Sequence, residues 1–512
     1  MLAKQNLSLA AIILVVGFVG SRLLGLVRNM VIGGVFGTGP ELDAYFAAFR
    51  IPDFLFQVIA GAALGSAFIP VFTTYLTKEG LEESWKLASA VLNLVGLATL
   101  AASIVALLAA PWIVPLTVPF FPSESQQLTT GLTVVMLVSP VFFSVSGIVT
   151  GILNGRHHFL LPALAPLVYN GSIIAAAVGL SASLGIYSLA VGVVAGALLH
   201  LMVQVPGLWQ GRMAYRWLLG FSHQGVREVG RLMAPRVLAL AAVQVNFLIT
   251  TILASALPSG SLAALSYAWA VMMMPLGVFG MSISTAVFPT MAEQAAVESY
   301  DNLGRTLTSS LRLVLFFTIP ASAGLILLRE PLVALLFERG LFDSFSTRAT
   351  SWALLFYSVG LFAHAMIEVL TRGFYALHDT RTPVGLAAAS VLVNVVLSLA
   401  LMRPLGHGGL ALSLSVATIL EAVVLFSLLH RHVPSLGHRT LLNSLGRVCV
   451  ATGLMAVAVV LMYRVGFGAG GSWPALETLA VVALGAVVFL LTTLVLGSDE
   501  AAMLKRWLLA GR

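Results

Sequence analysis

The chain has 512 residues, of which 59% are hydrophobic and only 9% are charged, and its mean hydropathy is +1.00. Soluble proteins contain roughly 45–50% apolar and about 25% charged residues, so this composition excludes a soluble protein and indicates a helical membrane protein. The net charge of +7 does not indicate a nucleic-acid partner, because no basic run stands apart from the apolar stretches. The single cysteine, Cys449, excludes an internal disulfide and a cysteine-based metal site.

Apolar stretches recur along the whole chain and predict an all-α polytopic membrane protein. Breaker residues such as those at 37–40, 122–123, 258–260 and 468–474 separate the stretches. Two more polar segments, at 330–345 and 298–305, are predicted to form amphipathic helices on the membrane surface. We predict about fourteen transmembrane helices, at residues 8–35, 44–76, 87–110, 127–153, 160–181, 184–206, 232–257, 262–294, 307–328, 349–376, 382–401, 407–429, 443–464 and 475–496.

The distribution of Lys and Arg predicts that both chain termini lie in the cytoplasm. With the N-terminus inside, the inner loops and tails hold 19 basic residues, the outer loops hold 5, and three arginines lie inside helices, which accounts for all 27. Cytoplasmic loops of membrane proteins carry such an excess of Lys and Arg. The same bias supports the helix count, because one missed helix would scramble the alternation.

Two short echoes suggest that the first twelve helices are a duplicated unit of six. Gly65–Pro70 resembles Ser284–Pro289 at an offset of 219, and the turn Gly155–His158 leading to Pro162 resembles the turn His378–Arg381 leading to Pro383 at an offset of about 221. Transporters built this way bind substrate between the two halves. The predicted organisation is an N-terminal lobe at 1–206, a cytoplasmic linker at 207–231, a C-terminal lobe at 232–430, and two further helices with a tail at 431–512.

Three arginines inside the first two apolar stretches are the most informative residues. Arg22, Arg28 and Arg50 cannot lose their charge, and an Arg at the centre of a membrane helix costs about 2.5–3.5 kcal/mol unless it faces a polar cavity. Ser21 and Arg28 follow the spacing of one helix face. The cluster predicts a cationic cavity, and planar guanidinium groups suit phosphate oxygens. The alternative is that individual arginines reach the membrane interface or form structural ion pairs.

Acidic and basic residues elsewhere are weaker candidates for the same cavity. Asp43 and Arg50 are seven residues apart and fall on one face of the second helix, with Asp53 further along. Arg236 and Arg372 lie near inner helix ends, where membrane topology alone explains them. For Glu368, a role in a cavity and a structural role in a buried ion pair are equally consistent with the sequence. The sequence contains no phosphate-binding loop, dinucleotide-binding turn or nucleophile–base set, so it indicates a carrier without cofactors and not an enzyme.

The stretches that contain the three arginines and Asp43 resemble the MurJ (MviN) family of lipid II flippases, within the multidrug and oligosaccharidyl-lipid exporters. The resemblance spans nearly the whole chain. The matching stretches are Ser21–Arg28, Asp43–Pro52, Ala67–Pro70, Gly373–Ala376, Asp379–Pro383 and Pro404–Leu410.

The resemblance implies two six-helix lobes around a central cavity, two extra C-terminal helices and alternating access in a bacterial cytoplasmic membrane. It implies a lipid-linked peptidoglycan precursor as cargo, with membrane lipids and cell-wall synthesis proteins as further partners. By the resemblance, Arg22, Arg28 and Arg50 would meet the pyrophosphate of the cargo, with Asp43 close by. The residue pattern itself adds Ser21 to this site and makes Asp53, Arg236, Glu368 and Arg372 candidates for a secondary part of the cavity.

The chain departs from the family pattern in ways that leave alternatives open. The family usually has Asp at the position of Asn29 and an arginine within the stretch that is Tyr267–Pro275 here. Either the N-terminal arginines suffice, or Arg236 or Arg372 substitutes, or the cargo is another polyprenyl-linked oligosaccharide. Helices 7 and 11 lack the carboxylates of the coupling-ion site known in some members, so no sodium site is predicted. A multidrug exporter would need acidic cavity residues, and a non-transporting scaffold would tolerate loss of the arginines.

Overall fold

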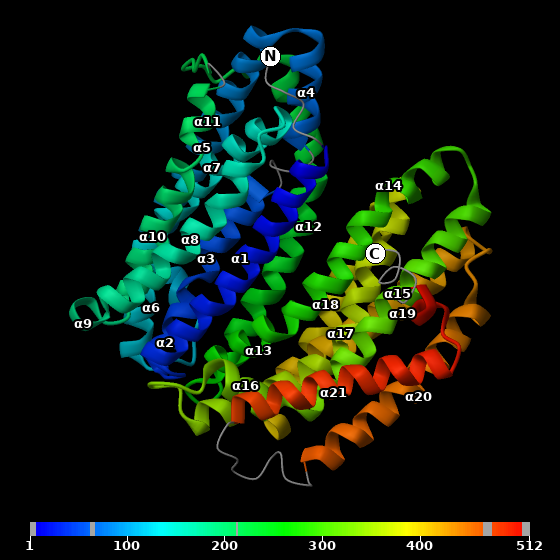
Figure 1. The fold of residues 1–512 in the computed structure, drawn as a ribbon. Helices are drawn as coiled ribbons and strands as arrows, with labels where there is room; N and C mark the ends of the chain where they lie inside the picture. The colour runs from blue at the N-terminus through cyan, green and yellow to red at the C-terminus, as the bar shows by residue number, and fades with distance from the viewer. Residues whose placement is uncertain (1–6, 62–66, 211–212, 464–473, 504–512) are drawn as a thin grey trace. The chain divides into compact units, whose positions relative to one another are not determined.

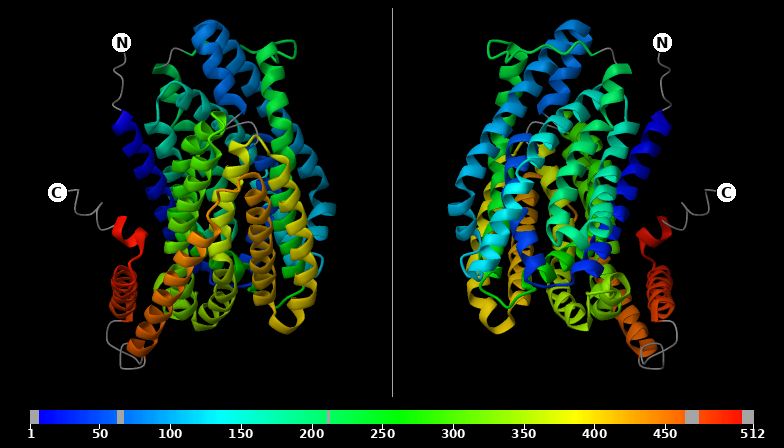
Figure 2. Two further views of the ribbon diagram at one scale, coloured as in Figure 1. Left: turned by 90° about the vertical axis from the view of Figure 1, so that its right-hand side faces the viewer. Right: turned by 90° about the vertical axis from the view of Figure 1, so that its left-hand side faces the viewer.

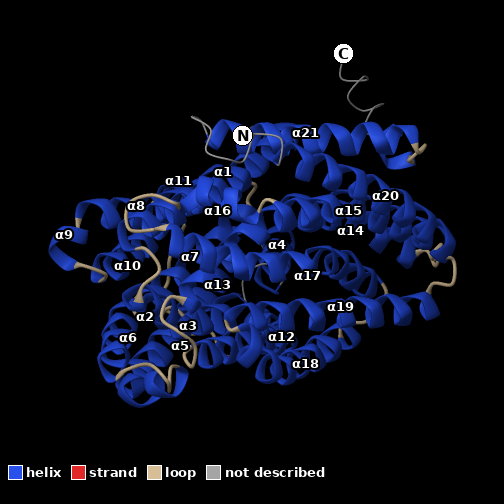
Figure 3. Ribbon diagram, turned by 90° about the horizontal axis from the view of Figure 1, so that it is seen from below, coloured by secondary structure: helices blue, strands red, loops and turns tan. Residues whose placement is uncertain are grey.

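The computed structural model describes residues 7–61, 67–210, 213–463 and 474–503, and every regular element among them is a helix (Figure 3). The described chain divides into two compact units (Figure 1). The first unit comprises Met1–Ala263 together with Arg339–Phe342, and the second comprises Ala264–Glu338 together with Asp343–Arg512. The predicted all-α fold class is confirmed.

The first unit packs its helices in a chain of close neighbours: α8 lies against both α1 and α10, and α5 lies against α7. One buried cluster of this unit brings Phe68, Phe72 and Trp85 together. The elements are α1 (Leu7–Phe36), α2 (Pro40–Ala48), α3 (Arg50–Leu55), the π-helix η1 (Phe56–Gly61), α4 (Ile69–Lys78), α5 (Leu81–Thr117), α6 (Ser123–Met136), α7 (Ser139–Gly155), α8 (Leu160–Gly179), α9 (Ser181–Leu184), α10 (Tyr187–Met202), α11 (Val205–Gln210) and α12 (Gln224–Ala254).

In the second unit, α17 packs against α15 and α19, and α18 packs against α19. Figure 2 shows the two last helices, α20 in orange and α21 in red, side by side, and Phe316 of α15 and Phe489 of α21 are buried in their common core. The elements are α13 (Ser261–Pro275, whose first three residues belong to the first unit), the π-helix η3 (Leu276–Met281), α14 (Ser282–Ala296), α15 (Tyr300–Leu327), α16 (Arg329–Phe337), α17 (Ser344–Ala376), α18 (Arg381–Leu405), α19 (His407–His432), α20 (His438–Met462) and α21 (Pro474–Val495).

Twelve helical stretches of the described chain are long and apolar enough to cross a membrane, so the chain is a multi-pass membrane protein. The two other predicted spans correspond to the interrupted segment Pro40–Lys78 and to α12, of which only Leu240–Ala254 forms a short apolar stretch. The count of fourteen and the orientation of the termini stay predictions.

The second predicted span is broken because of its sequence. Pro52 has no N–H to donate to the carbonyl of Ala48, and α2 ends at that residue. The hydroxyl of Thr133 approaches the same carbonyl at 3.5 Å. Beyond α3 the chain continues as η1, in which the backbone is wider than in an α-helix.

The backbone supports the predicted duplication through features that the sequence echoes did not contain. The π-helices η1 and η3 begin at Phe56 and Leu276, an offset of 220. In each of the turns after α7 and α17, one non-glycine residue of the described chain has a positive φ. These residues are His157 and His378, which are 221 positions apart. Gly185 and Gly406 also share positive φ at an offset of 221. These backbone features are rare because they are unfavourable for most residues, so their recurrence at nearly one offset is not expected by chance.

The boundary between the units falls later than the predicted lobe boundary. Helix α12 packs against α3, α4, α5 and η1, and therefore groups with the first unit. The predicted lobe boundary at residue 206 concerns the sequence repeat and not the compact units, and it stays a prediction.

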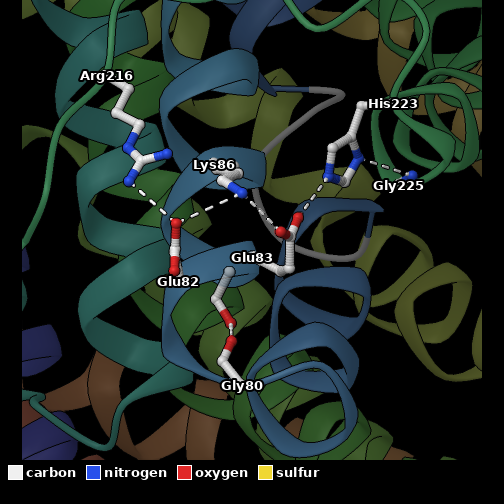
Figure 4. Close-up of polar contacts among 8 residues, drawn as sticks. Gly80, Glu82, Glu83, Lys86, Arg216, His223 and Gly225 are labelled. Atoms are coloured by element: carbon white, nitrogen blue, oxygen red, sulfur yellow. Dashed lines mark hydrogen bonds and ion pairs between the residues drawn. The ribbon is translucent and has the colours of Figure 1, made fainter.

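The predicted linker at 207–231 is docked on α5 (Figure 4). The Nη2 of Arg216 lies 3.0 Å from Oε1 of Glu82, and the Nζ of Lys86 lies 2.7 Å from Oε1 of Glu83. His223 caps α12 by accepting the Gly225 N–H at 3.1 Å. Acidic residues in the first turn of α5 suit the positive end of the helix dipole.

One predicted surface helix is present and the other is not. Residues 330–345 include α16, which ends at Phe337 with Val333 and Phe337 buried. The prediction of a separate amphipathic helix at 298–305 is wrong, because α15 begins at Tyr300 and continues without a break to Leu327. The polar residues near its start are simply the first turns of a long helix.

Candidate functional site

Helix α1 carries Arg22 and Arg28 on half-buried positions of a stretch that is apolar enough to span a membrane. The helix approaches α8 closely, because a Cβ on Gly17 would lie 2.6 Å from the Cβ of Ala163. The guanidinium of Arg22 lies over the ring of Phe18, 4.8 Å from its centroid. Six residues separate the two arginines, which is about 9 Å along a helix, and Ser21 is half-buried beside Arg22.

The guanidinium of Arg28 has a neutral hydrogen-bond partner. Its Nε and Nη2 lie 3.3 and 3.1 Å from Oδ1 of Asn29. Among the described residues, no carboxylate lies within 4.0 Å of this guanidinium. An amide partner leaves the full positive charge of Arg28 in place.

Two side chains of α3 are fastened to α12. The Nε of Arg50 donates to Oγ1 of Thr251 at 2.9 Å, and the guanidinium lies 5.3 Å from the ring centroid of Phe247. One turn further along α3, Oδ2 of Asp53 accepts from Nε2 of Gln244 at 2.8 Å. The pairs run in opposite chain directions, so α3 and α12 are antiparallel at this point.

Asp43 holds a turn and not an arginine. Its Oδ2 accepts the N–H of Gly260 at 2.6 Å, and its Oδ1 accepts the N–H of Ala263 at 2.7 Å, in a side chain that is only 2% exposed. Ala263 lies in the first turn of α13, where free N–H groups and the helix dipole favour a carboxylate. The prediction placed Asp43 and Arg50 on one face of a continuous helix, but α2 ends at Ala48 and α3 begins at Arg50, so the two residues lie on different helices. Asp43 contacts the turn before α13, whereas Arg50 contacts Thr251 of α12.

The candidates in the second unit form an ion pair of their own. The Nη1 of Arg372 lies 2.6 Å from Oε2 of Glu368 on the preceding turn of α17, and its Nη2 donates to Oγ1 of Thr285 at 3.0 Å. This pairing lowers the net charge that Arg372 offers to an anion. Arg236 lies within α12, but its side chain is outside the described part of the structure.

Sequence reasoning missed the neutral residues that surround the charged ones. Tyr169, His200, Gln244 and Thr251 lie in apolar stretches, where a single polar residue is usually a satisfied packing residue. A signal was present in the spacing of Gln244 and Thr251, which are seven residues apart and therefore share a helix face. Nothing in the sequence indicated that α12 lies against α3.

Long apolar helices, a duplicated set of backbone irregularities and arginines within apolar helices are features of secondary transporters. The fold is shared with a solved structure described as the inward-facing conformation of a multidrug resistance MATE family transporter of the MOP superfamily, which matches with a TM-score of 0.69 over 81% of this chain and 95% of that one, at 16% identity.

The particular family follows from the sequence. The family described as "Lipid II flippase MurJ" matches residues 32–472, and the chain belongs to this MurJ family. A Burkholderia cenocepacia protein named "Lipid II flippase MurJ" is 31% identical over 447 residues, 85% of this chain and 87% of that protein. A solved structure of a lipid II flippase MurJ in an inward closed conformation matches with a TM-score of 0.81 at 28% identity, over 95% of this chain and 99% of that one.

Proposed function

We propose that this protein is a flippase that moves lipid II, the polyprenyl-pyrophosphate-linked precursor of peptidoglycan, from the inner to the outer leaflet of a bacterial cytoplasmic membrane. Membership of the MurJ family supports the cargo, since the relative from Burkholderia cenocepacia carries the name of a lipid II flippase. The duplicated architecture supports alternating access as the transport mode. Membrane lipids surround the protein, and cell-wall synthesis proteins are proposed partners.

Arg22, Arg28 and Arg50 are proposed to bind the pyrophosphate. The single observation that carries this assignment is the neutral environment of Arg28: its hydrogen bonds go to the amide of Asn29, and no carboxylate among the described residues lies within 4.0 Å. By contrast, Arg216, Arg312 and Arg372 lie in ion pairs. A guanidinium without an internal counter-charge favours an external anion, and its fork matches two phosphate oxygens.

The remaining candidates have different proposed roles. Ser21 lies beside Arg22 and is proposed to add a hydroxyl to the anion site. Asp43 is proposed to position α2 against the turn before α13, because backbone N–H groups already occupy both of its oxygens. Glu368 and Arg372 are proposed to stabilise α17 through their ion pair. Arg236 stays a candidate for the secondary part of the cavity.

The test is complementation of a bacterium depleted of its own lipid II flippase, with wild type, Arg28→Ala, Arg28→Lys and the control Arg216→Ala at matched membrane levels. Arg216 is a suitable control because it is exposed and pairs with Glu82 outside the apolar part of α5. We expect wild type and Arg216→Ala to support growth and Arg28→Ala to fail. Loss of one charge-assisted pair, worth about 1.5–3 kcal/mol, should weaken binding of undecaprenyl pyrophosphate by about 10- to 150-fold.

The outcomes separate the function from the site. Rescue by wild type and Arg28→Ala alike would keep lipid II transport and remove the arginine assignment. Failure of a well-expressed wild type would overturn lipid II as the cargo and favour another polyprenyl-linked oligosaccharide. A purified protein that binds no polyprenyl pyrophosphate would contradict both.

A further inference from the structure

A cavity of about 450 Å³ lies within the first unit, bounded by α3, η1, α7, α8 and α10. Its volume is within the range of about 300–1,000 Å³ that is usual for small-molecule sites. It is separate from the hydrogen bonds of Arg28 and Arg50, whose partners Asn29 and Thr251 do not line it. Neither the proposed function nor the family name accounts for it.

The walls of this cavity are aromatic and continuous. The ring centroid of Phe143 lies 5.5 Å from that of Phe56, 5.0 Å from that of Tyr169 and 5.4 Å from that of His200. All four side chains line the cavity, and Phe49 adds a fifth ring. Aromatic faces carry negative potential and attract cations, most strongly where water is excluded.

A carboxylate completes the site. Asp53 lines the cavity, and the one partner seen for it among the described residues is the neutral amide of Gln244, on Oδ2. No Lys, Arg or His nitrogen of the described chain lies within 4.0 Å of its oxygens. Asp53 is half-buried at the cavity wall, and no cation of the described chain pairs with it, so a cationic ligand would meet its carboxyl group without displacing a described ion pair.

The other titratable group of the cavity does not supply that cation. Gln204 donates from Nε2 to Oγ of Ser146 at 2.8 Å, and that hydroxyl lies 2.7 Å from Nδ1 of His200. Nδ1 is the one acceptor seen for the Ser146 proton, so the network places the imidazole proton on Nε2 and leaves His200 neutral. Oε1 of Gln204 accepts from Thr150 at 2.8 Å, which fixes the orientation of the amide. His200 therefore brings no positive charge to the cavity wall.

We propose that this cavity binds an alkylammonium group, with Asp53 as its counter-ion and the rings of Phe56, Phe143 and Tyr169 around it. The site goes beyond the proposed function and stands whether or not lipid II is the cargo. An ammonium group can come from an amine on the cargo's peptide or from a free organic cation, and the two sources share the same chemistry.

The experiment measures binding of radiolabelled tetraethylammonium to the full-length protein in lipid nanodiscs at low salt. Wild type is compared with Asp53→Asn, which keeps an oxygen for Gln244 but removes the charge, and with Phe143→Leu, which removes the central ring. Glu41→Gln is the matched control, because Glu41 is an exposed carboxylate of α2 that does not line the cavity. We expect saturable binding by wild type and Glu41→Gln, and at least tenfold weaker binding by the other two variants.

Absence of saturable binding to wild type, or binding that both Asp53→Asn and Phe143→Leu leave unchanged, would overturn the proposal. Competition then identifies the source. Displacement by lysine-containing lipid II, but not by the same lipid with its amine acetylated, would assign the site to the cargo. Displacement by neither lipid would assign it to free organic cations. Because the probe carries no phosphate, these results are independent of whether the arginines bind pyrophosphate.

Discussion

Replacing Asp43 with Asn should release the turn before α13 without unfolding the protein. The carboxylate accepts two backbone N–H groups at 2.6 and 2.7 Å in a site that excludes water. Asparagine offers one oxygen and one NH₂ group, so one of the two backbone donors would face another donor. The side chain would then hold either Gly260 or Ala263, but not both.

The expected cost follows from these two bonds. A hydrogen bond to a charged group contributes about 1.5–3 kcal/mol, and a buried donor without a partner costs about 1–3 kcal/mol. The loss of one bond and the weakening of the other should therefore destabilise the closed turn by about 3 kcal/mol. A change of 1.4 kcal/mol is a factor of ten in an equilibrium constant, so the open form of the turn should become about 150-fold more populated.

Amide hydrogen exchange reports this opening directly. The peptide that contains Gly260 and Ala263 should exchange about 150-fold faster in Asp43→Asn than in wild type, in the same detergent and at the same pH. Glu41→Gln is the control, since Glu41 lies two residues away on α2 but is exposed. Exchange that stays within threefold of wild type would show that the turn is held by packing and would refute the assignment of Asp43.

Two further predictions concern the stability of the helices. Burial would raise the pKa of Glu500, but hydrogen bonds from Ser498, Arg312 and Ser444 hold that pKa below its ordinary value. The ionised Glu500 therefore stabilises the folded protein above about pH 4.3, and this contribution is lost as the pH falls through the lower folded pKa. Arg312→Met should therefore reduce the free energy of unfolding at pH 7 by about 3 kcal/mol, seen as a lower thermal unfolding midpoint. An equal reduction of the free energy of unfolding at pH 3.5 would contradict the argument. Gly192→Ala should cost about 1–3 kcal/mol in the same assay, because its Cβ would lie 2.8 Å from that of Ala176. Gly171→Ala on α8 meets nothing within 4 Å and should stabilise by about 0.5–1 kcal/mol, so an equal effect of both would refute the packing argument.

Sequence patterns were sufficient for the all-helical fold, because it follows from composition, whereas the duplication stays a prediction that the matched backbone irregularities support. The apolar runs predicted the ends of α17 and α19 within five residues, but α5 begins six residues before its predicted span and ends seven residues after it. They could not predict η1 or the break at Phe49, where a proline and local packing decide the backbone. They also could not place α12, because its packing against α5 and η1 depends on side chains far apart in sequence.

The candidate site was predictable as a set of charges but not as a set of pairs. Charge counting singled out Arg22, Arg28 and Arg50, since an arginine in an apolar stretch is conspicuous. It treated Asp43 as part of the same electrostatic group, whereas backbone N–H groups take both of its oxygens. Backbone donors carry no signal in the sequence, so a carboxylate that holds a turn is indistinguishable there from one that holds a cation.

One departure that the resemblance indicates concerns the charge of Arg28. The resemblance implies an Asp after the second arginine, whereas this chain has Asn29, whose Oδ1 lies 3.1 Å from the Arg28 guanidinium. A carboxylate there would cancel one positive charge, so the amide of Asn29 leaves the charge of Arg28 in place.

Asn29→Asp tests whether the charge of Arg28 binds the pyrophosphate. The new carboxylate would lie within ion-pair distance of Arg28 and compete with a phosphate for the same guanidinium. We expect undecaprenyl pyrophosphate to bind at least tenfold more weakly to Asn29→Asp than to wild type, whereas Asn29→Ala, which removes the amide without adding charge, should bind within threefold of wild type. Equal binding by all three proteins would mean that the charge of Arg28 is not what the pyrophosphate meets. In that case the positive charge that this chain retains at its first helix would need a different explanation from cargo binding.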